Sequence, residues 1–351
     1  MKKLVALTLA LAMSVSLFAG CGSTPASTPA STPASTPAST SASEPAEAEP
    51  EEATINVIYH PTIGGSTAVA TAITQGFFEE QNLNVNLQMY TSGPPEVAAM
   101  VANQAEFGFI GSGAAWLAFS GQVDIIALDN LALTEQIIAR TGISSIADLK
   151  GKTIAVQEGA AGYTLLLVAL QENGLTANDV KIMNIANDNI PSTYNDTSID
   201  AWAVWKPAAT SLLEALGDGG TVLADNQTYP EYAFPSTWIA NKDYIEKNPD
   251  VAQRFVTALT KAQIYRAENP DQACAYASTY AQQATNELTA QLPDVVFPTG
   301  EEFKEYYTTE AFVNMLTNLR ATQAENVEGD LTIEDIYEDT FAVAAINELV
   351  P

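Results

Sequence analysis

The chain of 351 residues carries 14 basic and 42 acidic side chains, which gives a net charge of −28 at pH 7. This balance excludes a nucleic-acid-binding protein, because contacts to phosphates need lysine and arginine. A zinc site takes three or four ligands, and one histidine with two cysteines, one of them at residue 21 near the N-terminus, is a poor supply of imidazole and thiolate ligands.

The N-terminal segment has the features of a secretory signal peptide. Lys2 and Lys3 precede an apolar stretch over residues 4–18, which is too short to span a bilayer as a helix. Residues 17–21 read LFAGC and look like a bacterial lipobox, whose cysteine is acylated and becomes the mature N-terminus. We therefore expect residues 1–20 to be removed and Cys21 to anchor the protein to the cell membrane, outside the cytoplasm, through its lipid. Cys274 then has no disulfide partner, and its apolar neighbours predict a buried thiol.

Residues 21–53 are predicted to form a disordered tether that begins at the lipidated cysteine. Residues 23–38 repeat the unit STPA, and residues 44–52 form an acidic run with further prolines. Neither segment can bury a hydrophobic core, so both should stay extended. At about 3.1 Å per residue such a chain reaches about 100 Å at most, which suits a domain that stays attached to a surface while clearing it.

From residue 54 onward, strand and helix patterns alternate. The first part predicts strands over residues 55–59, 85–90, 107–110 and 124–128 and helices over 68–80 and 95–104. After a crossover near residues 135–140, the sequence predicts strands over 153–156, 180–185 and 201–205 and helices over 163–173, 191–197 and 207–216. The last third predicts helices over 249–268 and 270–283 and amphipathic stretches from residue 301. This alternation predicts an α/β fold with mostly parallel sheets and helices on both faces.

The order of elements repeats between the two halves. Residues 92–95 (SGPP) open a short helix that leads to a strand near 107, and residues 188–191 (DNIP) open another that leads to the strand at 201–205. This repetition predicts two similar lobes with a central ligand cleft between them. We expect residues 54–135 and 236–351 to form lobe 1, with the helical C-terminal portion packed on it, and residues 136–235 to form lobe 2.

Three segments resemble motifs of a known family. They read QGFFEEQNL over residues 75–83, IADLKGKTIAV over 146–156 and IDAWAVWKPA over 199–208. In this order they are similar to the solute-binding proteins of nitrate, sulfonate and taurine ABC importers and their thiamine-pyrimidine-binding relatives. The resemblance implies a two-lobed type II periplasmic-binding-protein fold, without a cofactor, that closes on one small solute and docks on a membrane permease. We expect a monomer.

Candidate ligand contacts lie where strands end. In open parallel sheets, ligands bind beyond the carboxyl ends of the strands, where loops lead into helix N-termini with free N–H groups. Ser66 is equally well explained as a helix cap, and His60 as a hydrogen-bonded loop residue. The candidate ligand-binding residues are His60, Thr62, Ser66, Ser92, Gly111, Ser112, Trp116, Glu158, Gly159, Tyr163, Asn189, Trp205 and Lys206.

The tryptophans and Lys206 carry most of the expected specificity. Trp205 matches the pocket tryptophan that the resemblance implies, and it could stack on a flat ligand or enclose an aliphatic one, as could Trp116. Trp202 and Trp238 are expected in the core. The family often has an acidic residue after the pocket tryptophan, where this chain has Lys206, and hydroxyl residues after position 158, where this chain has alanines. Lys206 either contacts an anionic ligand or forms a salt bridge with Glu158.

The sequence favours binding over catalysis. It has no nucleophile elbow, no phosphate-binding loop and no paired cysteines for a metal, so we expect no enzyme and no catalytic or metal-binding residues. The expected function is capture of a small sulfonate-, nitrate- or taurine-like solute for an ABC importer. The alternatives are a flat heteroaromatic ligand such as a thiamine-precursor pyrimidine, a pyrimidine-forming enzyme on the same fold, and a lipoprotein sensor or adhesin.

Overall fold

The computed structural model describes residues 50–229 and 232–351. The predicted signal peptide, Cys21 and nearly all of the predicted tether lie outside the described residues. Pro50, Glu51 and Glu52 are exposed and belong to no helix or strand, whereas Ala53 already pairs with Leu83 as the first residue of a strand. The folded part therefore begins one residue before the predicted boundary. In the described ranges, no helix combines the length and the apolar character needed to cross a membrane.

The first sheet has six strands in the order β11-β4-β10-β3-β1-β2. Strands β1, β2 and β3 run parallel, while β10 is antiparallel to both β3 and β4, and β11 is antiparallel to β4. The strands are β1 (Ala53–Tyr59), β2 (Leu83–Met89), β3 (Phe107–Ile110), β4 (Asp124–Ala132), β10 (Pro235–Ala240) and β11 (Val295–Val296). We call this sheet and the helices packed on it lobe 1.

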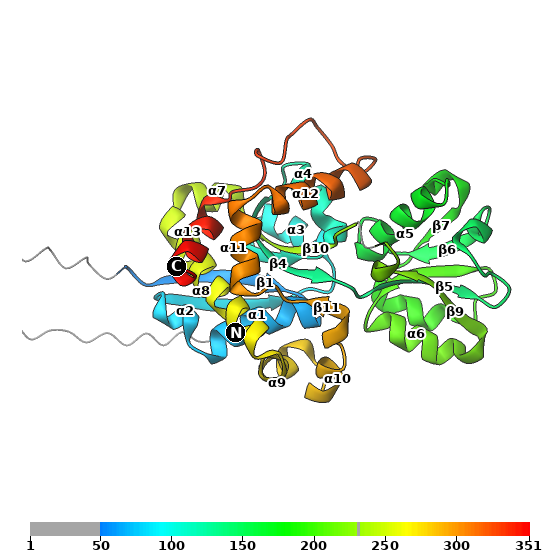
Figure 1. Ribbon diagram of the computed structural model, residues 1–351, viewed down its shortest axis with the longest axis horizontal. Helices are drawn as coiled ribbons and strands as arrows, with labels where there is room; N and C mark the ends of the chain where they lie inside the picture. The colour runs from blue at the N-terminus through cyan, green and yellow to red at the C-terminus, as the bar shows by residue number, and fades with distance from the viewer. Residues whose placement is uncertain (1–49, 230–231) are drawn as a thin grey trace, which may run out of the picture. The chain divides into compact units, whose positions relative to one another are not determined.

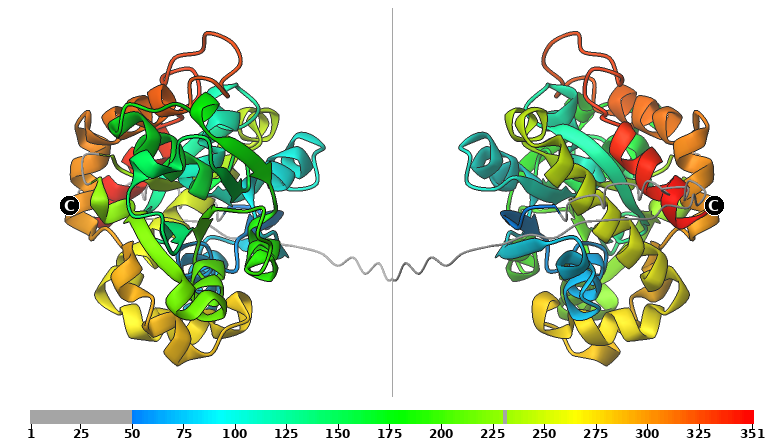
Figure 2. Two further views of the ribbon diagram at one scale, coloured as in Figure 1. Left: turned by 90° about the vertical axis from the view of Figure 1, so that its right-hand side faces the viewer. Right: turned by 90° about the vertical axis from the view of Figure 1, so that its left-hand side faces the viewer.

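The C-terminal third packs on the six-stranded sheet of lobe 1. Phe255 of α8 (Pro249–Glu268) stacks on Phe107 of β3 with ring centroids 4.1 Å apart. Trp238 of β10 contacts the Phe255 ring in an edge-to-face arrangement. Figures 1 and 2 show the C-terminal helices, coloured yellow to red, gathered around the six-stranded sheet. The other helices of lobe 1 are α1 (Ile63–Thr74), α2 (Phe77–Glu80), α3 (Gly93–Val101), α4 (Ala115–Phe119), α7 (Lys242–Lys247), α9 (Pro270–Ala281), α10 (Thr285–Thr289), α11 (Gly300–Thr308), α12 (Ala311–Thr322) and α13 (Thr340–Leu349).

The second sheet has five strands in the order β7-β6-β8-β5-β9 and forms lobe 2 with two covering helices. Along β8, Ala201 and Ala203 face a core that includes α5, while Trp202 and Val204 face a core that includes α6, as the alternation of a strand requires. The elements are β5 (Glu135–Arg140), β6 (Thr153–Val156), β7 (Lys181–Asn184), β8 (Ala201–Trp205), β9 (Gly220–Asp225), α5 (Ala161–Glu172) and α6 (Ala208–Leu216). Trp202 and Trp238 are fully buried, which confirms their predicted place in the core.

Most strands of each sheet run in one direction, as predicted, but β10 and β11 run opposite to the rest of the first sheet and β5 runs opposite to the rest of the second. The predicted crossover at 135–140 is strand β5 itself. Two predicted helices differ from the structure. The predicted helix 68–80 begins earlier and is split, since Gly76 adopts a left-handed conformation (φ 76°) that ends one helix and starts the next. The helix predicted at 191–197 is a 3₁₀ segment over Asn187–Thr193.

Candidate functional site

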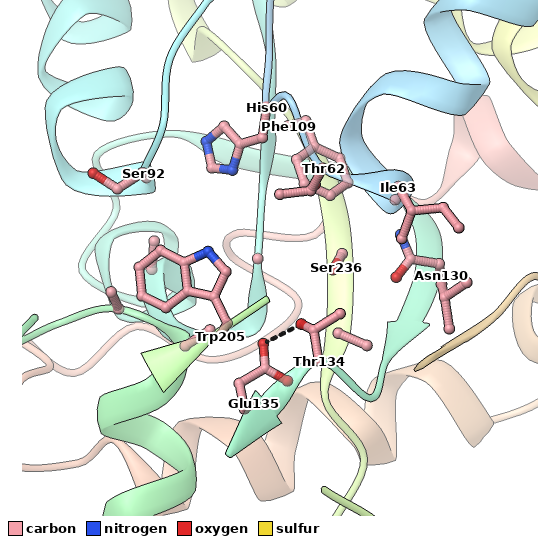
Figure 3. A pocket seen from close by; sticks show the side chains of 18 residues that line it. His60, Thr62, Ile63, Ser92, Phe109, Asn130, Thr134, Glu135, Trp205 and Ser236 are labelled. Carbon is pink, nitrogen blue, oxygen red and sulfur yellow. Dashed lines mark hydrogen bonds between the residues drawn. The ribbon is translucent and has the colours of Figure 1, made fainter. Parts of the chain in front are cut away.

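A pocket lies between the two sheets and is lined from both lobes (Figure 3). The space inside it measures about 570 Å³ when solvent at its open side is included. Lobe 1 and the connection after β4 supply His60, Thr62, Ile63, Gly64, Ser92, Gly93, Phe109, Gly111, Ala114, Asn130, Ala132, Thr134, Ser236 and Val295. Lobe 2 supplies Glu135, Ala160, Ala161 and Trp205.

Helices α1, α3 and α5 all begin at this pocket. The Thr62 side chain caps α1 by accepting a hydrogen bond from the backbone N–H of Gly65 at 3.2 Å. Ser92 and Ala160 precede α3 and α5 without a side-chain cap. In α3, residues 94 and 95 are prolines without an N–H, so the start of this helix offers the N–H of Gly93 and its dipole, whereas α5 begins with residues that all carry an N–H. Helix N-termini carry unpaired donors and a partial positive charge. Their meeting at one pocket favours an oxyanion or another electron-rich group.

The orientation of His60 is set by a buried carboxylate. His60 Nε2 lies 2.7 Å from Glu96 Oε2, and the ring meets Phe109 edge-on with centroids 5.3 Å apart. Glu96 is fully buried, and burial raises its pKa while the charge of His60 and its hydrogen bond act to lower it. Because one ring nitrogen is held by Glu96, the imidazole is fixed at the wall of the pocket.

A buried ion pair supports the floor of the site in lobe 1. Arg266 Nη1 lies 3.0 Å from Asp129 Oδ2, and both side chains are inaccessible to solvent. The same Asp129 oxygen accepts a hydrogen bond from Asn130 Nδ2 at 2.6 Å, and Arg266 donates to the carbonyl of Gly64 at 3.4 Å. Two pocket residues, Asn130 and Gly64, are thus positioned by a charged pair that does not itself line the pocket.

Glu135 and Trp205 form the lobe 2 side of the site. Glu135 is only 2% exposed, and burial raises its pKa. Its Oε1 accepts a hydrogen bond from Thr134 Oγ1 at 3.1 Å, drawn as a dashed line in Figure 3, while its Oε2 has no partner among the described residues. Trp205 is half-buried, and its backbone N–H donates a hydrogen bond to Asn187 Oδ1 at 3.1 Å.

Several contacts join the lobes around the pocket. Trp116 Nε1 of lobe 1 donates to the Gly159 carbonyl of lobe 2 at 3.2 Å. Gln323 Nε2 donates to the Ser112 carbonyl and to Thr164 Oγ1 of lobe 2, both at 2.9 Å. These hydrogen bonds hold the two walls of the pocket against each other.

Five of the predicted ligand contacts line the pocket: His60, Thr62, Ser92, Gly111 and Trp205. Trp116, Gly159 and Ser112 lie instead at the contact between the lobes. Ser66 is buried inside α1, where its hydroxyl donates to the Thr62 carbonyl at 2.7 Å.

The remaining four candidates lie outside the pocket lining. Asn189 and Glu158 are exposed, and Tyr163 is half-buried with a pKa raised by burial and by nearby acidic side chains. Lys206 Nζ pairs with Asp294 Oδ2 at 2.7 Å, so neither of its expected partners, Glu158 or a ligand, is needed to balance its charge. The sequence could not predict this pair, because Asp294 is 88 residues away in the chain and belongs to the other lobe.

The sequence did not point to four polar residues that line the pocket: Asn130, Thr134, Glu135 and Ser236. The first three lie around the step from β4 to β5, and Ser236 lies in β10. The β-branched pair Ile137 and Ile138 is a strand signal that would have placed Glu135 near a strand start. In the described parts of the chain, no group of three or more His, Cys, Asp or Glu side chains could hold a metal ion.

Residues 65–273, more than half of the chain, match the model of the family described as NMT1/THI5 like. A protein of Brucella abortus named as a binding protein is 32% identical over 228 residues, which are 65% of this chain and 72% of that relative. The taurine-binding periplasmic protein of Escherichia coli is 30% identical over 200 residues, 56% of this chain and 61% of that protein.

Solved structures share the fold. The periplasmic aliphatic sulphonate binding protein SsuA from Escherichia coli aligns with a TM-score of 0.61 and 20% identity, covering 81% of this chain and 91% of that chain. The desulfurization enzyme DSZB aligns with a TM-score of 0.60 and 16% identity, covering 84% of this chain and 99% of that chain. The fold therefore occurs in binding proteins and in an enzyme, and the extent of the family match shows that this chain belongs to the NMT1/THI5-like family.

Proposed function

We propose that the protein is the extracytoplasmic solute-binding component of an ABC importer, which captures a small sulfonate-, nitrate- or taurine-like solute and delivers it to a membrane permease. The observation that carries the proposal is the pocket between the lobes, where three helices begin beside Thr62, Ser92 and Ala160. Relatives named for taurine and for aliphatic sulfonates support the same class of solute.

The chemistry of the pocket suits such a solute. The helix N-termini and the hydroxyls of Thr62 and Ser92 offer hydrogen-bond donors to an oxyanion. Phe109 and Trp205 offer an apolar wall for a short carbon chain. A charged group bound here gains from partial exclusion of water, because electrostatic interactions strengthen as the local dielectric constant falls.

We propose further that a lipid on Cys21 anchors the protein and that it works as a monomer. The support for the anchor is the LFAGC sequence at residues 17–21. An anchored binding domain would deliver its solute to the permease from the outer face of the same membrane.

A flat heteroaromatic solute is the second candidate. Trp205 and Phe109 at the pocket favour it, since a planar ring can stack on either, and Glu135 offers an acceptor for a ring substituent. The likeness to DSZB does not add an enzymatic candidate, because a fold hosts many unrelated functions.

Native mass spectrometry of the purified protein, followed by thermal unfolding with a solute panel, tests the proposal. The panel contains taurine, alkanesulfonates, nitrate and pyrimidines. A compound present at about 100 times its dissociation constant should stabilise the protein by about 2.7 kcal/mol. Stabilisation by pyrimidines alone would contradict the first candidate and favour the second.

Trp205→Ala tests whether the pocket is the binding site. Loss of this aromatic wall should weaken the best compound of the panel about 10–100-fold, as expected for an aromatic side chain in a binding site. Tyr194→Ala is the matched control, because Tyr194 is an exposed aromatic residue of the same lobe. Equal affinities of the Trp205 variant and the wild type would place the binding site elsewhere.

A further inference from the structure

Glu135 is a buried carboxylate whose hydrogen bonds are incomplete. It begins β5, lines the pocket and is 2% exposed. Its backbone N–H donates to Asn226 Oδ1 at 2.8 Å, and its Oε1 accepts from Thr134 Oγ1. Its Oε2 is buried without a partner in the described part of the chain. A buried polar atom that lacks a partner is costly, so this oxygen marks a place where a partner is expected.

The described residues offer no cation to this carboxylate. The residues that line the pocket include no lysine and no arginine. Lys206, close in sequence to Trp205, is paired with Asp294, and Arg266 is paired with Asp129. His60, the remaining group that could carry a positive charge at the pocket, is held by Glu96. Burial raises the pKa of Glu135, and hydrogen bonds from Asn226 and Thr134 act to lower it, but neither partner carries a positive charge. A buried carboxylate is stabilised most by a cationic partner, which an ammonium group of the solute would supply.

We propose that Glu135 receives an amino or ammonium group of the solute, so that the pocket selects compounds that carry such a group over simple oxyanions. This inference rests on the proposed function and narrows its substrate class. The donor group would hydrogen-bond to Glu135 Oε2 on the lobe 2 side of the pocket.

The positions of the other polar groups fit this arrangement. In Figure 3, Glu135 lies at one end of the site beside Trp205, and His60 and Ser92 lie toward the other end. A solute placed between them presents its electron-rich end to the starts of α1 and α3 and its nitrogen to Glu135. A bare oxyanion such as nitrate or ethanesulfonate offers no donor to the carboxylate and is repelled by it when it is ionised.

Two pairs of compounds test the inference by isothermal titration calorimetry. Taurine is compared with ethanesulfonate, and 4-aminopyrimidine with pyrimidine, so that each pair differs in the amino group. The wild type should bind one amino compound at least about 30-fold more tightly than its partner, because loss of a buried charged hydrogen bond costs about 2 kcal/mol or more. The pair that shows the preference identifies whether the amino group belongs to an aliphatic sulfonate or to a heteroaromatic ring.

Glu135→Gln should remove this preference. It keeps the shape of the side chain and deletes the buried charge, so the affinity for the preferred amino compound should fall about 30-fold while that for its amino-free partner changes less than about threefold. Glu214→Gln is the matched control, since Glu214 is an exposed acid of lobe 2 that does not line the pocket, and it should bind as the wild type does.

The outcomes separate this inference from the proposed function. If the amino-free compounds bind as tightly as the amino compounds and Glu135→Gln changes nothing, the inference is wrong and the solute-binding function stands. If no compound of either pair binds the wild type, both the inference and the proposed function are wrong for this class of solutes. Should Glu135→Gln fail to fold, the two wild-type comparisons still decide the matter.

Discussion

The two lobes face the same solute with different chemistry. Lobe 1 brings hydroxyl and amide side chains and two helix N-termini to the pocket, with a buried charged network behind them. Lobe 2 brings Trp205, the uncapped start of α5 at Ala160 and the carboxylate of Glu135. Lobe 1 therefore suits the electron-rich end of a solute, and lobe 2 suits its apolar and donor portions. Similar architectures thus supply complementary halves of one site.

The lobes also differ in how they hold charge. The Asp129–Arg266 pair is fully buried in lobe 1, whereas the ion pairs within lobe 2, Lys150–Asp179 and Lys152–Asp200, are substantially exposed. Lobe 1 should therefore depend on its charges for stability far more than lobe 2 does.

Asp129→Asn should cause the largest effect. It leaves Arg266 as an uncompensated buried charge, which is expected to destabilise the protein by about 3–5 kcal/mol. Urea unfolding measures the loss. Asp179→Asn, which breaks an exposed pair of lobe 2, is the control and should change stability much less. Similar losses in both variants would show that the two lobes do not differ in this respect.

Gly113→Ala tests whether solute binding needs the two lobes in contact. A Cβ on Gly113 would overlap the backbone of Ala160 and Ala161 where the two lobes touch, so the lobes could not approach each other as they do here. The fold of each lobe should survive, because the overlap arises only between them. If closure falls below about 1% of molecules, affinity should fall about 100-fold.

Calorimetry with the best compound of the solute panel measures this loss. Gly219→Ala is the control, since a Cβ there meets no atom within 4 Å. Unchanged affinity of Gly113→Ala would mean that the solute binds to the separated lobes.

Asp124 tests whether lobe 1 also carries a costly charge away from the site. It begins β4, the strand that ends at the pocket, and burial raises its pKa from 3.8 to about 6 despite the nearby Lys242. Above pH 6 the folded protein must hold an ionised carboxylate that the unfolded chain accommodates more easily. Asp124→Asn, which resembles the protonated form, should therefore be more stable than the wild type by about 2 kcal/mol at pH 7.5.

This difference should shrink as the pH falls through 6 and should be nearly absent near pH 4, where the wild-type carboxyl is protonated when folded. Urea unfolding at pH 7.5, 6.0 and 4.5 measures it. Asp243→Asn removes an exposed charge nearby, and its stability profile should run parallel to that of the wild type. A difference between Asp124→Asn and the wild type that stays constant with pH would contradict the assignment.

The comparison of the lobes also shows what the sequence could and could not predict. Strand ends that lead into helices are local signals, and three residues that they mark, His60, Ser92 and Trp205, line the pocket. Strand β10 lies between β3 and β4 and pairs with both, although their residues precede it by more than 100 positions in the chain. No local sequence pattern could predict that pairing. The repeat of elements between the halves predicted two lobes, but it could not predict that their pocket residues would differ in chemistry.

The smallest expected effect concerns the ion pair that crosses between the lobes. Lys206 of lobe 2 and Asp294 of lobe 1 are 2.7 Å apart, with side chains 22% and 17% exposed. Because the pair forms only when the lobes approach, it should favour the closed form without touching the solute. In a double-mutant cycle with Lys206→Ala and Asp294→Ala, the coupling energy measured from solute affinity should be about 1 kcal/mol and should fall as salt is raised. The exposed pair Lys150–Asp179 lies within lobe 2 and should show no coupling to affinity.

If Lys206→Ala alone weakens binding far more than Asp294→Ala, the ammonium group of Lys206 acts on the solute directly. Lobe 2 would then supply a cation to the site as well as the Glu135 carboxylate.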